Sequence, residues 1–90
     1  MKSAKILVIG RVQGVWFRDF VQRNAISLKL SGWVKNTPDG YVILEVEGEE
    51  EIINNLIEKI KIGSPLSKVK DIKIKWHPFE QKFNSFEILR

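Results

Sequence analysis

The order of two kinds of apolar periodicity along 90 residues is the feature that most restricts the fold. Some segments alternate apolar and polar residues as a strand does, and others repeat apolar residues at the spacing of an amphipathic helix. They follow one another as strand, helix, strand, strand, helix, strand, with a short strand-like segment at the end. The expected strands are 5–10, 33–36, 41–48, 69–76 and 84–89, and the expected helices are 18–28 and 49–62.

Turn residues separate these segments. Thr37-Pro38-Asp39-Gly40 has tight-turn chemistry, since proline presets φ and glycine supplies positive φ, so a hairpin is expected. Ser31-Gly32 is expected to break the pattern after the first helix, and Gly63-Ser64-Pro65 to end the second. With two crossover helices on one face of a mostly antiparallel sheet, the order predicts a ferredoxin-like α+β sandwich. We expect residues 1–90 to form one such domain.

The same periodicities predict which side chains are buried. The third strand should place its aliphatic residues on one face and Glu45 and Glu47 on the other. Ile53, Leu56, Ile57 and Ile60 should form the buried stripe of the second helix. In the fourth strand, three residues should point inward, namely Ile72, Ile74 and Trp76.

Composition excludes several function classes. There is no cysteine, so disulfides, thiolate metal sites and thiol catalysis are excluded. No segment approaches the roughly 18 apolar residues that a membrane span requires, and the short apolar run near the N-terminus is not typical of a secretory signal. The net charge of +4 is modest, and the lysine-rich segment KVKDIKIK is more typical of a solvated strand face than of nucleic-acid binding.

The stretch GRVQGVWFRDF, at 10–20, lies between the first strand and the first helix. A loop that enters a helix N-terminus offers unpaired N–H groups and a favourable dipole to an anion. Gly14 permits backbone geometry that other residues resist, and Arg18 could bind two phosphate oxygens at once. On spacing alone, a plain tight connection is the commoner interpretation. Val15, Trp16 and Phe17 are expected to lie mostly in the core, and the side chain of Gln13 could simply hold the loop.

Two motifs in the chain resemble the signatures of the acylphosphatase family. They are VIGRVQGVWFR at 8–18 and GWVKNTPDGYVILEVEG at 32–48, in the family's order and spacing, and the resemblance spans the whole chain. It implies hydrolysis of acyl phosphates to a carboxylate and inorganic phosphate by a small stand-alone enzyme without cofactor or metal. It also implies that Asn36 orients the attacking water, and that the phosphoryl group is bound by Arg18 and by the main-chain N–H groups of Val12, Gln13, Gly14, Val15, Trp16 and Phe17.

The residue chemistry agrees with this resemblance. Neither motif contains a histidine, a serine nucleophile or a pair of carboxylates, and the only histidine, His77, lies near the end of a strand. Such a site can act only on an activated substrate, and an acyl phosphate has a weakly basic carboxylate as leaving group. Asn36 has an alternative role, because asparagine ahead of a turn often caps that turn with its own side chain. Asp19 is expected to serve the helix dipole rather than to act as a base.

The chain departs from the family pattern where the first helix ends. Leu28-Lys29-Leu30 stands where the family commonly has a glycine between two leucines. Either a lysine occupies a left-handed helix cap, at a cost of about 1 kcal/mol relative to glycine, or the helix ends differently. The departure concerns local geometry and leaves the proposed site residues in place.

Two binding functions compete with hydrolysis. RNA-recognition domains share this element order, but the two central strands lack the aromatic residues on which bases would stack. A phosphate- or carbamoyl-phosphate-binding regulatory module could keep the loop without turnover. We expect instead a cytoplasmic monomer that acts on a small acyl phosphate, is inhibited by its phosphate product, and binds neither nucleic acid nor membrane.

Overall fold

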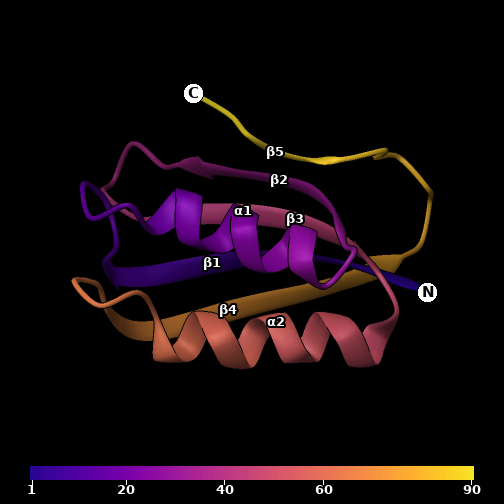
Figure 1. The fold of residues 1–90 in the computed structure, drawn as a ribbon, viewed down its shortest axis with the longest axis horizontal. Helices are drawn as coiled ribbons and strands as arrows, with labels where there is room; N and C mark the ends of the chain where they lie inside the picture. Colours follow the sequence, from indigo (N-terminus) through magenta and orange to yellow (C-terminus); the bar gives the residue numbers. More distant parts are fainter.

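A computed structural model describes all residues from 1 to 90 and contains five strands and two helices (Figure 1). The seven elements closely follow the expected order. Their bounds are β1 Lys2–Arg11, α1 Phe17–Ser27, β2 Ser31–Asn36, β3 Val42–Gly48, α2 Glu50–Ile62, β4 Lys68–Pro78 and β5 Phe86–Ile88.

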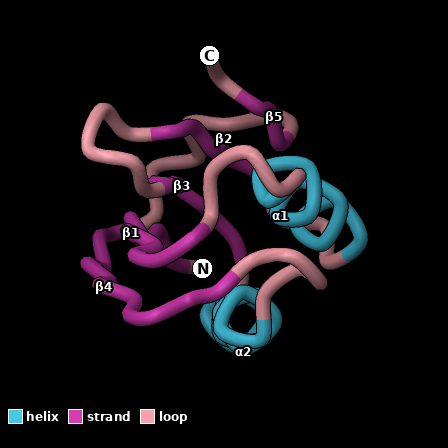
Figure 2. The backbone as a smooth tube through the Cα atoms, turned by 90° about the vertical axis from the view of Figure 1, so that its left-hand side faces the viewer, coloured by secondary structure: helices cyan, strands magenta, loops and turns pink.

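The strands form one sheet in the order β4-β1-β3-β2-β5. All neighbouring pairs are antiparallel except β2 and β5, which are parallel. Both helices lie on the same side of this sheet (Figure 2). Because β3 lies between β1 and β2, those two strands run in the same direction, as a split β-α-β unit requires. The predicted ferredoxin-like sandwich with an added terminal strand is confirmed.

The core lies between the helices and the sheet. Its 17 buried apolar residues include Val42, Leu44 and Val46 of β3, as predicted. Helix α2 buries the four residues that its periodicity indicated, and α1 buries Phe17, Val21 and Ala25. Each fully buried aliphatic or aromatic side chain contributes about 1.5–3 kcal/mol. Packing therefore fixes the start of α1 through the ring of Phe17, which is 1% exposed.

The inward direction predicted for Ile72, Ile74 and Trp76 of β4 is confirmed, but these residues are not fully buried. Ile74 and Trp76 pair with Ile6 and Ala4 of β1, so they share the helix-facing side of the sheet. They are nevertheless 39% and 38% exposed, and Ile72 is only half-buried. Strand β4 is at the edge of the sheet, and α2 covers it incompletely.

The break predicted at Ser31-Gly32 is wrong, because both residues belong to β2. Helix α1 ends at Ser27, and the chain turns at Lys29, which has φ 60°. The N–H of Lys29 donates to the carbonyl of Ile26, and the N–H of Leu30 donates to that of Ala25. This is a Schellman cap, so a lysine does occupy the left-handed position usually taken by glycine.

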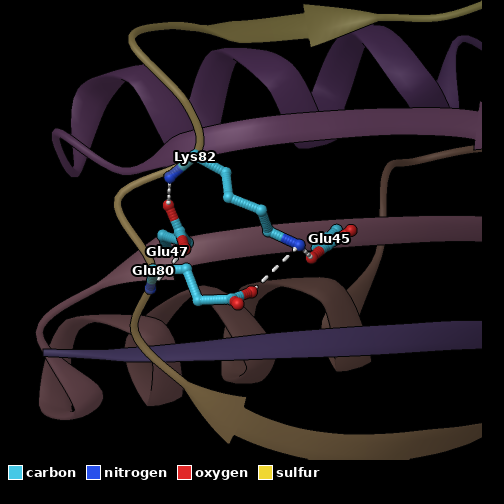
Figure 3. Close-up of polar contacts among 4 residues, drawn as sticks. All are labelled: Glu45, Glu47, Glu80 and Lys82. Carbon is cyan, nitrogen blue, oxygen red and sulfur yellow. Dashed lines mark hydrogen bonds and ion pairs between the residues drawn. The ribbon is translucent and has the colours of Figure 1, made fainter.

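The connection between β4 and β5, residues 79–85, crosses the face of the sheet opposite the helices and is bound to it by polar contacts (Figure 3). Glu47 is 1% exposed and accepts hydrogen bonds from the N–H groups of Glu80 (3.1 Å) and Lys82 (2.8 Å). The ammonium group of Lys82 lies 3.0 Å from the carboxylate of Glu45, and the hydrogen bond to Glu45 is the main cause that raises the pKa of Lys82. Glu45 and Glu47 face away from the aliphatic side as predicted, but nothing in the sequence indicated that they are buried.

Candidate active site

The loop from residue 12 to residue 16 joins the end of β1 to the start of α1. Gly14 has φ 73° and Trp16, the residue before the first helical turn, has φ 61°. None of the five N–H groups of residues 12–16 donates a hydrogen bond to another backbone group. The first-turn N–H groups of α1 lack intrahelical acceptors as well, as in any helix. The loop therefore presents a series of free donors at the positive end of a helix dipole.

Gly14 is needed here for its backbone conformation. A side chain with φ 73° would be strained, yet a Cβ at this position would meet no atom within 4 Å. The protein itself therefore leaves the space over Gly14 open. An anion can approach the loop backbone there without displacing any side chain.

Arg18 lies in the first turn of α1, half-buried. Its Nη1 donates to the carbonyl of Leu89, just beyond β5, at 3.2 Å. It forms no ion pair with any acidic side chain, unlike Arg23 on the same helix, which pairs with Asp19 at 3.0 Å. A guanidinium has five N–H donors, so most of those of Arg18 remain free for a ligand.

Asn36 is the last residue of β2 and is exposed. Since β1 and β2 run in the same direction on either side of β3, the end of β2 lies at the same edge of the sheet as the end of β1. The side chain of Asn36 forms no hydrogen bond, because Thr37 closes the turn instead: its Oγ1 accepts from the N–H of Tyr41 at 3.0 Å. The turn-capping alternative for Asn36 is therefore not what the structure contains.

Gln13 connects the loop to the hairpin that follows Asn36. Its Nε2 donates to the carbonyl of Thr37 at 3.0 Å and to the carbonyl of Tyr41 at 2.7 Å. The side-chain role considered for Gln13 is thus what the structure shows. These two bonds fix the distance between the loop and the end of β2.

A cavity of about 420 Å³ lies where these elements meet, and both Arg18 and Asn36 line it. Of the other residues expected at the site, Gln13 and Val15 are outside its lining. The whole lining consists of nine residues: Val12, Gly14, Trp16, Phe17, Arg18, Asp19, Asn36, Ile88 and Arg90.

Three of these positions were not anticipated as parts of the site. Ile88 and Arg90 come from β5 and the segment after it, and no local motif marks them because their place depends on β5 pairing with β2. Asp19 is expected from the sequence to serve the helix dipole, and its carboxylate does pair with Arg23.

Trp16 is expected from the sequence to lie in the core, but it is 80% exposed because its left-handed backbone turns it outward while Phe17 enters the core.

No three side chains from the set of His, Cys, Asp and Glu lie close enough together to bind a metal ion. Neither helix is long and apolar enough to cross a membrane.

Comparison with known proteins gives consistent results. A family model described as acylphosphatase matches residues 4–88. The chain is 41% identical to an acylphosphatase of Methylococcus capsulatus, over all of this chain and 98% of the relative. The crystal structure of acylphosphatase from Bacillus subtilis superimposes with a TM-score of 0.96 at 44% identity, covering 100% of both chains.

A larger protein contains a similar unit. The crystal structure of full-length HypF, in a phosphate- and nucleotide-bound form, matches with a TM-score of 0.87 at 32% identity. The match covers 99% of this chain and 12% of that one.

Proposed function

Since this chain belongs to the acylphosphatase family and hydrolyses acyl phosphates to a carboxylate and inorganic phosphate, we propose that the cavity at the ends of β1 and β2 is its active site. The observation that carries this proposal is the position of Arg18 and Asn36, which line one cavity beside a loop of unpaired N–H groups. Positive donors and a neutral amide with free hydrogen-bonding capacity thus meet in one place.

The loop and Arg18 bind the phosphoryl group. The N–H groups of residues 12–17 and the helix dipole attract the negatively charged oxygens, and the guanidinium of Arg18 binds them from the side. These donors are oriented before the substrate arrives, so they stabilise charge in the transition state without reorganisation. The bond from Arg18 to the carbonyl of Leu89 holds the guanidinium in place.

Asn36 positions the attacking water. Its amide oxygen accepts a hydrogen bond from the water, which attacks phosphorus in line with the acyl oxygen. A P–O bond to the water forms as the P–O bond to the acyl oxygen breaks, and the carboxylate leaves with the electron pair. Because a carboxylate is weakly basic, no acid has to protonate it, and the proton of the water passes to the phosphate product or to solvent.

The side chain of Gln13 contributes to this reaction by holding the phosphate-binding loop close to Asn36. Its two bonds tie the loop to the carbonyls of Thr37 and Tyr41, which flank the turn after Asn36. The phosphate donors and the water-orienting amide belong to different strands, so this link sets their separation. Gln13 is therefore a positioning residue, with its own main-chain N–H in the loop.

A steady-state assay on benzoyl phosphate tests the proposal. We expect turnover with a metal chelator present, and competitive inhibition by inorganic phosphate, because product and substrate share the phosphoryl site. The control is the protein unfolded by denaturant. Binding of inorganic phosphate without turnover would contradict the enzyme mechanism and favour a phosphate-binding regulatory module. Absence of both turnover and phosphate binding would overturn the proposed function altogether.

We further propose that the chain acts as a single domain over residues 1–90, as a cytoplasmic monomer that uses no cofactor or metal and binds no nucleic acid. The sheet face on which RNA-recognition domains stack bases carries Glu45 and Glu47 here, under residues 79–85. Light scattering on the purified protein tests the monomer, and cell fractionation tests the compartment.

A further inference from the structure

Trp16 is an unusually exposed tryptophan at the rim of the cavity. It is 80% exposed and lines the cavity beside Gly14 and Arg18. Its backbone has φ 61°, a conformation that residues other than glycine rarely adopt. Folding does not need this indole in the core, because Phe17 alone fills the buried position at the start of α1.

The backbone of Trp16 has a fixed position. The carbonyl of Trp16 accepts the N–H of Phe20 at 3.0 Å, and the ring of Phe17 packs 5.8 Å from that of Phe20. The residue after the indole is thus anchored in the core. The backbone geometry that frees the N–H groups of the loop also directs the side chain of Trp16 outward.

Apolar surface in the cavity comes almost entirely from two side chains. Four of the lining residues are hydrophobic, but Val12 and Phe17 are each only 1% exposed. Trp16 and the half-buried Ile88 remain. They come from the loop and from β5, so a group attached to a phosphate on the loop would lie between two different elements of the structure.

We propose that Trp16, with Ile88, forms the subsite for the acyl group and selects substrates with flat or branched apolar acyl groups over the smallest ones. The inference rests on the proposed function and names the substrate class of that site. The main-chain donors and Arg18 contact the phosphoryl group, which is identical in every acyl phosphate, so they cannot distinguish one substrate from another. Discrimination has to come from the rim, where an aromatic face can pack against the acyl group.

The test compares benzoyl phosphate with acetyl phosphate. The measured quantity is the ratio of the two kcat/KM values, which cancels any damage that affects both substrates equally. We expect W16N to lower this ratio about 3- to 10-fold, the range of a lost aromatic contact. Asparagine is chosen because it tolerates left-handed backbone, and W16F should restore most of the ratio.

The control is W76A, which removes an exposed tryptophan of β4 that does not line the cavity, and its ratio should equal that of the parent. An unchanged ratio in W16N, or an equal change in W76A, would overturn the inference while leaving acyl phosphate hydrolysis intact. Failure of the parent to hydrolyse either substrate would instead overturn the proposed function, and this inference with it.

Discussion

Groups of backbone N–H donors lie at two opposite ends of the sheet, and they differ in whether the protein itself supplies an acceptor. At the end where residues 79–85 cross, Glu47 accepts the N–H groups of Glu80 and Lys82 from within the protein. At the other end, the N–H groups of residues 12–16 have no backbone acceptor. The cations differ in the same way, since Lys82 pairs with Glu45 whereas Arg18 has no acidic partner.

This difference separates stability from function. A buried donor that meets its own carboxylate contributes to folding, and losing that partner is costly. Donors left open to solvent cost little, because water satisfies them, and they remain available to a ligand. The incomplete pairing around Arg18 is what supports the proposed anion site there.

The largest expected effect comes from removing Arg18, the cation without an acidic partner. Arg18→Ala should lower kcat/KM for benzoyl phosphate by about 10³-fold and abolish inhibition by inorganic phosphate, because both ligands lose the same guanidinium. Initial rates and phosphate inhibition constants measure this. Arg23→Ala is the matched control, since Arg23 lies on the same helix and pairs with Asp19. Phosphate inhibition that persists in Arg18→Ala would contradict the role of Arg18.

Asn36 should show a different pattern at the same end of the sheet. Asn36→Ala is expected to lower kcat by about 10²-fold, because the water is no longer oriented, while the phosphate inhibition constant changes little. Asn54→Ala, an exposed asparagine on α2, serves as control. If Asn36→Ala weakened phosphate binding as strongly as it slowed turnover, Asn36 would belong to the phosphate site instead.

At the opposite end, the change should appear in stability. Glu47→Ala leaves two N–H groups without an acceptor and should lower the free energy of unfolding by about 2–3 kcal/mol. Urea denaturation followed by fluorescence measures this quantity. Glu51→Ala removes an exposed carboxylate of α2 and should have little effect. An unchanged midpoint in Glu47→Ala would mean that residues 79–85 do not depend on Glu47.

The smallest effect concerns alkaline pH. The hydrogen bond to Glu45 raises the pKa of Lys82 above its ordinary value of 10.5. A raised pKa in the folded state means that this contribution is complete below pH 10.5 and is lost as pH rises through the higher folded value. The stability difference between the parent and Lys82→Met should therefore shrink above that pH in denaturation series. A difference that stayed constant into strong alkali would show that the charge of Lys82 contributes nothing.

Local patterns predicted much of this protein. The order of strands and helices, the buried stripe of α2, the hairpin at Thr37–Gly40 and the loop before Arg18 all follow from short-range spacing and turn chemistry. The left-handed cap at Lys29 does not follow from its residue type, because lysine disfavours that backbone conformation, and only the family's glycine at this position raised the possibility. The meeting of Arg18 and Asn36 at one edge followed only once the topology was known.

Long-range pairing decided the rest. Because β4 is an edge strand, Ile74 and Trp76 stay partly exposed despite a strand pattern like that of the interior. The alternation of β3 placed Glu47 on the outer face, but only residues 79–85, more than thirty positions away in the chain, bury it. Ile88 reaches the cavity through β5 pairing with β2. Sequence periodicity predicts the face of a strand or helix on which a side chain lies, whereas the burial of that side chain depends on which distant segment covers the face.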